Sequence, residues 1–409
     1  MVSRIEKCRV GGSPELVSVL SLGDQALTGV FPRSADTNIT EGPLELVWCP
    51  KSGLLQLAHV YDPSEMYGDN YGYRSGLNAS MVQHLTRKIQ HLQRTADLKP
   101  GDTVLDIGSN DATLLKSYTV PSLRRIGIDP TGNKFRQYYP DDVELVPDFF
   151  TAANYRKVSS KRAAVITSIA MFYDLEDPIS FVRDVSQSLD ADGVWHFEQS
   201  YLPAMLRQNS YDTICHEHVE YYSLSSVEKI LSAGDMRILD VAMNDVNGGS
   251  FAVTAGHASS KRPANEAFVD WLLAQEEHMG LHTLRPYREF EDRVYRHRDD
   301  LLALLKSLRS AGKRILGYGA STKGNVVLQF CGIDATLVEA IAEVNPDKFG
   351  CVTPGTKIPI VSEEEAHRMK PDYLLVLPWH FRSGIIQREA EFIARGGKLI
   401  FPFPHIEVV

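Results

Sequence analysis

The sequence has few cysteines, no long apolar run and no excess of positive charge. Its five cysteines are scattered and odd in number, which favours reduced thiols over a disulfide framework. No apolar run approaches the roughly 20 residues that a membrane helix needs, and the first residues lack the apolar core of a secretory signal. The net charge of −9 differs from the basic balance of nucleic-acid-binding proteins. We expect a cytoplasmic protein, monomeric or weakly homo-oligomeric, with no membrane or nucleic-acid partner.

The length of 409 residues predicts two or three domains, because one hydrophobic core rarely exceeds about 250–300 residues. Residues 1–80 mix two short strand-like runs, LELVWC and LLQLAHV, with turns and predict a small α+β domain. Residues 81–258 alternate apolar strands with helical segments, which is typical of a parallel sheet. Residues 259–312 predict a helical connector, and four apolar runs in residues 313–409 predict a second, Rossmann-like sheet. The predicted fold class is therefore α/β.

The clearest signal for a ligand is the turn after the first strand of the central region. Asp106 lies near the end of this strand, Gly108 follows it, and a helical pattern begins after Asn110. Glycine lets a ligand approach the backbone because it has no Cβ, and a helix N-terminus offers free N–H donors. The turn lacks the G-x-G-x-x-G pattern of dinucleotide-binding folds, which disfavours an NAD enzyme.

Residues after the next three strands extend this candidate cofactor site. An acid at the end of the second strand accepts hydrogen bonds from ribose hydroxyls in nucleotide-binding folds. An acid and two aromatic rings after the third strand suit adenine, and the residues after the fourth strand, up to Tyr173, are expected at the methyl-donor end. The residues are Asp129, Pro130, Asp148, Phe149, Phe150, Ser168 and Met171. The ordered set favours S-adenosylmethionine as ligand over an ordinary sheet turn.

A polar and aromatic stretch downstream of the fourth and fifth central strands is the candidate chemistry site. Its histidines, His216 and His218, flank Glu217, two residues apart rather than four as in the zincin motif. In an extended segment such histidines share a face, so a metal site stays open as an alternative. Histidine can remove a proton near neutral pH, which favours a general base oriented by Glu217 or a tyrosine. The remaining alternative is a set of polar residues that cap a helix from Leu224.

Three further segments are weaker candidates. Residues 247–250, Asn-Gly-Gly-Ser, form a turn that is either functional or a plain hairpin. Residues 71–76 could bring tyrosine hydroxyls over a substrate or form a surface loop. Residues 317–325 follow a strand and open a helix, so their N–H groups and Lys323 suit a phosphate; a structural turn is the alternative.

These motifs together resemble the sugar C-methyltransferases of deoxysugar and antibiotic biosynthesis, which are class I methyltransferases, along nearly the whole chain. The most specific pieces are the D-x-G-x-N turn at 106–110, the YDTICHEH segment at 211–218 and the GYGASTKGN turn at 317–325. The resemblance implies a zinc-binding N-terminal domain, a central methyltransferase domain and a C-terminal Rossmann-like domain. It also implies S-adenosylmethionine as cofactor and a nucleotide-linked 4-keto sugar as substrate.

The resemblance assigns roles to residues of this chain. His218 would remove the proton beside the ketone, with Glu217 next to it, and the C-terminal turn with Trp379 would hold the nucleotide diphosphate. The candidate catalytic residues are His218, Glu217, Tyr71, Tyr73 and Tyr222. The candidate substrate-binding residues are Glu198, Tyr201, His216, Asn247, Gly249, Tyr318, Ser321, Lys323, Asn325 and Trp379.

The chain departs from the family pattern at several positions. The family holds zinc with two C-x-x-C pairs, whereas here Gly11 and Ser52 replace the second cysteine of each pair. Two thiolates do not make a closed structural zinc site, so we expect zinc to be absent or the site degenerate. Cys215 and Met171 stand where members of the family carry tyrosine and histidine, which predicts a variant subfamily.

Other functions stay open at the level of sequence. The same base could serve an epimerase, in which the enolate is reprotonated instead of methylated. Cofactor binding is common to all methyltransferases, so O- or N-methylation is a further alternative. A third class is a binding module that keeps the cofactor site without its chemistry; the intact His218 and Glu217 disfavour it.

Overall fold

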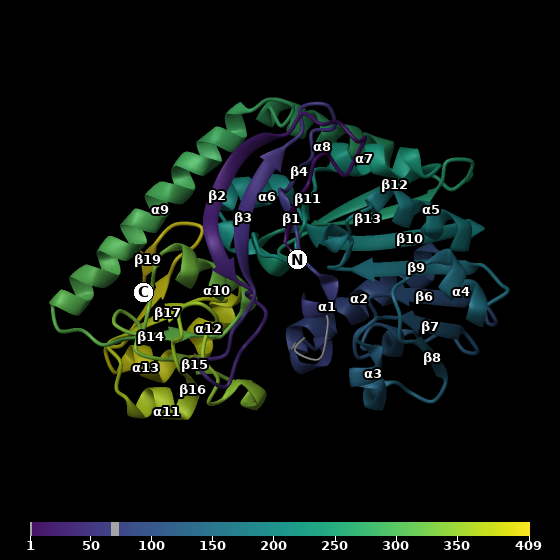
Figure 1. The fold of residues 1–409 in the computed structure, drawn as a ribbon. Coiled ribbons are helices and arrows are strands. Elements are labelled where there is room, and N and C mark those ends of the chain that lie inside the picture. Colours follow the sequence, from purple (N-terminus) through teal and green to yellow (C-terminus); the bar gives the residue numbers. More distant parts are fainter. Residues whose placement is uncertain (1, 67–72) are drawn as a thin grey trace.

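The structure is a computed structural model that describes residues 2–66 and 73–409. The described residues contain a seven-stranded, a six-stranded and a four-stranded sheet and a two-stranded ribbon. In Figure 1 the seven-stranded and six-stranded sheets lie on opposite sides of the long strands of the N-terminal sheet. The predicted α/β class, with a Rossmann-like central sheet, is confirmed. No helix among the described residues is long and apolar enough to cross a membrane.

The central sheet has the strand order β12-β13-β10-β9-β6-β7-β8. Strands β10 to β8 of this order are parallel, and β12 and β13 form an antiparallel hairpin at one edge. The strands are β6 (Thr103–Ile107), β7 (Arg124–Ile128), β8 (Val143–Val146), β9 (Ala163–Ile169), β10 (Leu189–Ser200), β12 (Met236–Asn244) and β13 (Ser250–His257). Because the parallel strands point the same way, the turns that follow them meet at one edge of the sheet.

Helices connect and cover these strands. They are α2 (Ala79–Thr95), α3 (Gly132–Phe135), α4 (Ala152–Val158), α5 (Pro178–Ser188), α6 (Leu202–Gln208) and α7 (Leu224–Ala233). Helix α7 begins after Ser223, whose side chain forms a capping box with Ser226. The polar stretch therefore does end in a helix cap, as one of the sequence alternatives proposed, but this cap lies beyond His218.

The N-terminal sheet has the order β11-β4-β3-β2 and is antiparallel. Its strands are β2 (Val17–Ala26), β3 (Glu41–Trp48), β4 (Leu55–Leu57) and β11 (Glu220–Tyr221), and β1 (Ser3–Arg4) pairs with β5 (His59–Val60) beside the short helix α1 (Pro63–Met66). The sequence patterns predicted β3 and β4 but not β2. Strand β11 comes from the central region, directly after His218, and so joins the two domains.

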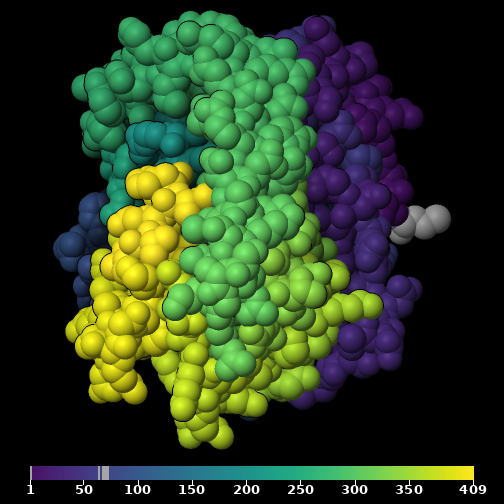
Figure 2. Space-filling model, turned by 90° about the vertical axis from the view of Figure 1, so that its left-hand side faces the viewer, coloured from purple at the N-terminus to yellow at the C-terminus, as the bar shows by residue number. Residues whose placement is uncertain are grey.

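The connector consists of α8 (Glu266–Met279) and α9 (Arg285–Ser310). Figure 2 shows α9 running along one face of the molecule, between N-terminal residues and the C-terminal domain. Its buried side, which includes Tyr287, Phe290 and Val294, packs into the same apolar cluster as both neighbours. The long helix α9 of the predicted connector therefore contacts both the N-terminal residues and the C-terminal domain.

The C-terminal sheet has the order β16-β15-β14-β17-β18-β19, parallel except for β19. Its strands are β14 (Ile315–Tyr318), β15 (Ile341–Glu343), β16 (Ile360–Ser362), β17 (Tyr373–Val376), β18 (Lys398–Phe401) and β19 (Glu407–Val408). The helices are α10 (Thr322–Phe330), α11 (Glu363–Arg368), α12 (Arg382–Arg388) and α13 (Ala390–Ala394). The four apolar runs of the sequence correspond to β14, β15, β17 and β18; β16 and β19 are additional.

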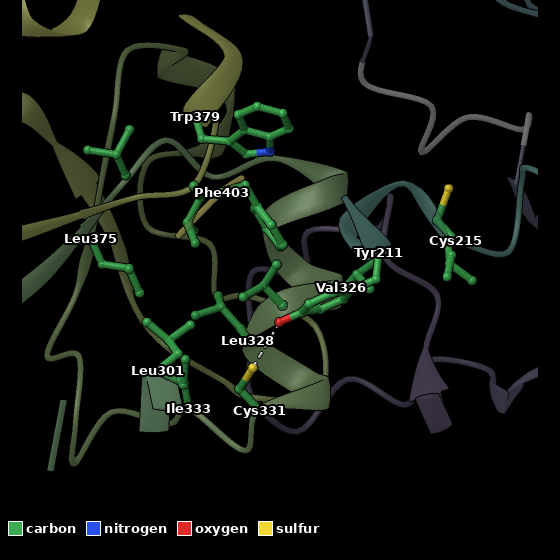
Figure 3. Close-up of a cluster of buried hydrophobic side chains, with 14 of the residues drawn as sticks. Tyr211, Cys215, Leu301, Val326, Leu328, Cys331, Ile333, Leu375, Trp379 and Phe403 are labelled. Atoms are coloured by element: carbon green, nitrogen blue, oxygen red, sulfur yellow. Dashed lines mark hydrogen bonds between the residues drawn. The ribbon is translucent and has the colours of Figure 1, made fainter. Parts of the chain in front are cut away.

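Tyr211 anchors the C-terminal domain to the central one. Its ring, which is fully buried, packs edge-on against Phe403 and Phe330 at centroid distances of 5.0 and 5.3 Å. Its hydroxyl lies 3.4 Å from the thiol of Cys331, and Figure 3 shows both within the apolar cluster of the C-terminal domain. Two residues later the same segment reaches Thr213, whose carbonyl oxygen contacts His218.

Candidate active site

A large cavity, with a volume of about 740 Å³, is lined mainly by the central domain, with contributions from residues after β5 and from the start of α10. Its wall includes residues of the turns after β6, β7 and β9, of α2, of the segment around His218 and of the start of α10. This volume falls within the range of small-molecule sites. The cavity therefore has room for a cofactor and part of a second ligand.

The glycine turn forms one end of the cavity. Gly108 has a φ of 72°, and its N–H donates to the carbonyl oxygen of Ile128 at 2.9 Å. A Cβ at this position would lie 3.2 Å from the Cγ of Met171. Glycine is therefore required both for the backbone conformation and for the close approach of the β9 turn.

Two acids lie beneath this turn and line the cavity. Asp129 accepts hydrogen bonds from the N–H of Asn110 and of Thr131, both at 2.7 Å, and from the Thr131 hydroxyl at 2.6 Å. Asp106 accepts from the Thr167 hydroxyl at 2.6 Å, and burial raises its pKa to about 7. Asp129 thus holds the turn in shape, with part of its carboxylate left for a ligand.

A short segment after the undescribed residues covers the same turn. The N–H groups of Ser75 and Gly76 donate to the side chains of Asn110 and Asp111, both at 3.0 Å. The Asn110 amide in turn donates to the carbonyl oxygen of Tyr73 at 3.1 Å. Tyr73 is half-exposed and lines the cavity. Tyr71 lies outside the described residues.

The other predicted cofactor residues divide into two sets. Pro130, Phe149, Phe150 and Met171 line the cavity. Asp148 is exposed and is not part of the wall, and its carboxylate accepts from the N–H of Phe149 at 2.7 Å. Ser168 is buried and accepts from the indole of Trp195 at 3.0 Å. Asp148 and Ser168 therefore do not reach the cavity wall.

His218 lies in the wall with its two ring nitrogens in different roles. Its Nδ1 lies 2.9 Å from the carbonyl oxygen of Thr213, so Nδ1 carries the proton and donates it there. Nε2 then keeps a free lone pair. Burial, together with the charge of Lys323, lowers the pKa of His218 to about 4. The imidazole is therefore neutral near pH 7, as a general base must be.

Two neighbours complete the surroundings of this imidazole. The ring of Tyr173 packs against it with the centroids 4.3 Å apart. Glu217 also lines the cavity, and burial raises the pKa of its carboxyl group. A Cβ added to Gly29 would lie 2.6 Å from Glu217 Oε1, so the N-terminal domain packs directly on this carboxylate. The contact of His218 Nδ1 is with the Thr213 carbonyl; a role of Glu217 in orienting the imidazole stays a prediction.

Lys323 is a residue of the C-terminal domain that lines the cavity. It lies in the first turn of α10, beside Thr322, and both residues line the wall. Its Nζ donates to the carbonyl oxygen of Asn247 at 3.1 Å, and Asn247 lines the wall as well. The ammonium and the helix N-terminus together make this end of the cavity favourable for an anion.

Glu198 lies at the end of β10 in a polar cluster at the cavity wall. Its carboxylate pairs with His84 Nε2 at 2.6 Å and with Lys88 Nζ at 2.7 Å, both from α2. The amide of Asn244 donates to it at 2.6 Å. Although burial opposes ionisation, these partners lower the pKa of Glu198 to about 2. Most of its acceptor capacity is used within the protein.

The remaining candidates lie outside the wall of the large cavity, each with a partner of its own. Tyr222 donates to Glu220, Tyr201 to Glu276 at 2.8 Å, and Trp379 to Asp212 at 2.8 Å. Tyr318 donates to Glu363, Asn325 to the carbonyl oxygen of Thr28 at 2.7 Å, and Ser321 caps α10. His216 packs against Tyr61 at a centroid distance of 4.6 Å, and Gly249 accepts from the Tyr201 N–H at 3.1 Å.

Sequence reasoning missed several residues of the wall. They include Met81 and Leu85 of α2, Gln199 at the end of β10, and Thr322 beside Lys323. Gln199 is buried, and neither atom of its amide has a hydrogen-bond partner among the described residues. Nothing local in the sequence of α2 indicates that its apolar residues line the same cavity as the glycine turn.

Comparisons with known families cover most of the chain. Residues 81–241 match a family model described as "Methyltransferase domain", and residues 245–404 match "C-methyltransferase C-terminal domain". Residues 8–67 match "Putative zinc binding domain". The C-methyltransferase NovU of Streptomyces niveus is 33% identical over 413 residues, which span 100% of this chain and 98% of that protein. The chain belongs to the C-methyltransferase family. It is a methyltransferase that depends on S-adenosylmethionine.

Two solved structures are similar to part of this chain. One is an S-adenosylmethionine-dependent methyltransferase from Clostridium acetobutylicum, 17% identical, which covers 43% of this chain and 92% of its own at a TM-score of 0.34. Another is the plantazolicin methyltransferase BpumL in complex with S-adenosylhomocysteine, 14% identical, which covers 42% of this chain and 82% of its own at a TM-score of 0.34.

Proposed function

We propose that this C-methyltransferase methylates the carbon beside the ketone of a nucleotide-linked 4-keto deoxy sugar, with His218 as the base. The observation that carries the proposal is the hydrogen bond from His218 Nδ1 to the Thr213 carbonyl, at 2.9 Å. It leaves Nε2 unprotonated in a residue that lines the same cavity as the glycine turn. A carbon acid beside a carbonyl becomes a nucleophile only after such a base removes its proton.

The cofactor fits the residues at the other end of the cavity. Gly108, Asn110 and Asp129 would hold S-adenosylmethionine, with Phe149 and Phe150 beside its adenine. When bound, the cofactor supplies an electrophilic methyl group. Met171 and the ring of Tyr173 line the stretch between the turn and His218 and are suited to exclude water from it.

The nucleotide part of the substrate is assigned to the end of the cavity formed by the C-terminal domain. Lys323 and the N-terminus of α10 are the groups there that attract a diphosphate. Tyr73, from the segment over the glycine turn, would approach the sugar. As the enolate forms, the positive charge of Lys323 also favours negative charge developing near His218.

The test is methyl transfer to a panel of nucleotide-linked 4-keto deoxy sugars in the presence of S-adenosylmethionine, followed by mass spectrometry. The expected result is a product that carries one additional methyl group on carbon. His218→Ala should lower the rate of methyl transfer at least about 100-fold. Tyr222→Phe, outside the cavity, is the matched control and should keep turnover. No methylated product from any sugar, or full activity of His218→Ala, would contradict the proposal. Solvent deuterium uptake without methylation would favour the epimerase.

A further inference from the structure

Two glycine turns of the N-terminal domain bring Cys8 and Cys49 together. The N–H of Gly12 donates to the Cys8 carbonyl at 3.1 Å, and that of Gly53 to the Cys49 carbonyl at 2.8 Å. The Cys8 thiol is among the groups that lower the pKa of the Cys49 thiol, and the side chains are 3% and 0% exposed. Facing turns of this kind, each with a cysteine pair, are how small domains build a tetrahedral zinc site.

The donor set of this chain does not fit zinc. Gly11 and Ser52 occupy the positions of the second cysteine in each turn, which leaves two thiols. The described residues contain no group of three histidine, cysteine or acidic side chains that could hold a metal ion. Structural zinc sites are closed by four protein ligands, almost all sulfur or imidazole nitrogen.

Hydrogen bonds occupy the space between the turns instead. The Ser52 hydroxyl lies 3.1 Å from the Cys8 thiol, and the Gln56 amide nitrogen donates to the same sulfur at 3.2 Å. An N–H₂ group aimed at a sulfur is a donor and cannot be a metal ligand. Gln56 Oε1 accepts from the Arg9 N–H at 3.1 Å and its guanidinium at 3.3 Å, so a fixed positive charge lies close by and would repel a divalent cation.

The same cluster is tied to the methyltransferase domain. Lys229 of α7 donates to the Ser52 carbonyl at 2.7 Å. Gln56 lies in β4, opposite Glu220 of β11, and the Leu57 N–H donates to the Val219 carbonyl at 2.8 Å. The turns therefore hold the strand that pairs with the segment directly after His218.

We propose that the hydrogen-bonded cluster of Cys8, Cys49, Ser52 and Gln56 replaces the metal of this domain, which folds and docks without zinc. The cluster does with neutral donors and acceptors what four ligands do around an ion: it fixes two turns relative to each other. The inference concerns the N-terminal domain alone and is independent of the proposed substrate, because its readouts are metal content and unfolding temperature.

The first experiment uses the full chain purified from a zinc-supplemented culture. Elemental analysis is expected to find no stoichiometric zinc, and a strong chelator is expected to leave the Tm unchanged. About one zinc per chain, or a fall in Tm on chelation, would overturn the proposal. Cys8→Ser keeps a hydrogen-bonding group at the position and should fold with a modest fall in Tm that zinc does not reverse. Recovery of that Tm by zinc would count against the proposal.

The second experiment restores the missing thiols with Gly11→Cys and Ser52→Cys together. A Cβ at Gly11 meets no atom within 4 Å, although its φ of 83° strains any side chain. The double variant is expected to bind about one zinc per chain and to lose Tm on chelation, unlike the native chain. Ser52→Cys alone, with three thiols and no strained residue, is expected to bind zinc more weakly. Zinc uptake by neither variant would contradict the claim that the cluster stands in the place of a metal.

Discussion

A main-chain carbonyl, rather than a carboxylate, orients the ring of His218. A carboxylate beside the imidazole would favour its charged form and raise its pKa, whereas the neutral Thr213 carbonyl fixes the tautomer at Nδ1 with less effect on charge. Burial and Lys323 then lower the pKa of His218 to about 4. The imidazole, the proposed base, is consequently neutral throughout the physiological range.

A first prediction concerns the pH dependence of this base. Proton removal requires neutral His218, so the rate falls as pH drops through its pKa in the folded protein, about 4. Lys323→Met removes the cation that helps to lower this pKa, so the acidic limb should move to higher pH. The measurement is the pH profile of hydrogen–deuterium exchange at the carbon beside the ketone of the substrate. The His218 imidazole is titrated by NMR in parallel. Lys313→Met, on the surface, is the control and should not shift the acidic side of the pH profile. A shift in Lys313→Met, or no shift in Lys323→Met, would contradict the account.

A second prediction tests the glycine turn. Gly108→Ala places a Cβ at a φ of 72°, 3.2 Å from Met171, and left-handed backbone costs a non-glycine residue about 1–2 kcal/mol. If this strain distorts the turn, affinity for S-adenosylmethionine should fall roughly 5–30-fold, measured by calorimetry. Gly101→Ala is a matched control, since Gly101 has a φ of 90° with no atom within 4 Å of a Cβ. Gly101→Ala should lower stability but leave the affinity for S-adenosylmethionine unchanged. Equal affinities of the two variants would refute the assignment of the Gly108 turn to the cofactor.

At the scale of elements, Glu198 ties α2 to the end of β10. Its carboxylate is 3% exposed and holds Lys88, which is 9% exposed. Loss of one partner in such a buried pair leaves an uncompensated charge and costs about 3–5 kcal/mol. Helix α2 carries Met81 and Leu85 to the cavity wall, so the pair also positions part of this wall.

A third prediction follows for Glu198→Gln. Because the folded pKa is lowered to about 2, the carboxylate stabilises the protein above the unfolded pKa near 4.5, and this contribution is lost as pH falls from 4.5 towards 2. The variant should unfold about 3 kcal/mol more easily at pH 7, with the deficit undiminished at pH 6. Denaturant unfolding measures this. Adding Lys88→Met should recover part of the loss, and a purely additive double variant would contradict the pairing.

Local patterns allowed many strands and the glycine turn to be predicted, because strand, glycine and helix follow one another within a few residues. The same reasoning gave candidates such as Tyr222 and Tyr201, which are close in sequence to His218 but donate to Glu220 and Glu276 outside the large cavity. The Thr213 carbonyl could not be predicted, since a main-chain acceptor leaves no residue-type signal. Strand β2 was missed because its polar residues interrupt the apolar pattern.

At the scale of the whole molecule, the segment from Tyr211 to Tyr221 contacts both the C-terminal domain and the N-terminal sheet beside the cavity. Tyr211 inserts into the C-terminal cluster (Figure 3), Thr213 orients His218, and Tyr221 pairs with the N-terminal sheet. The C-terminal domain also contributes Lys323. The domains therefore act as parts of one site rather than as separate modules.

A fourth prediction tests this docking through Trp379. Its indole donates to Asp212 at 2.8 Å, across 167 residues of sequence. Trp379→Phe leaves the buried carboxyl of Asp212 without that donor, which costs about 1–3 kcal/mol and loosens the segment that orients His218. We expect a lower Tm and a lower kcat with cofactor affinity unchanged. Trp271→Phe, at an exposed tryptophan of α8, should change neither; similar effects of both substitutions would argue against the docking role.

Proton removal by His218 is the central claim, and it can be measured without methyl transfer. A nucleotide-linked 4-keto deoxy sugar is incubated in deuterium oxide with the enzyme and S-adenosylhomocysteine, and uptake at the carbon beside the ketone is followed by mass spectrometry. The account predicts exchange of one carbon-bound hydrogen, slowed at least about 100-fold in His218→Gln. Exchange at an undiminished rate in that variant would contradict it.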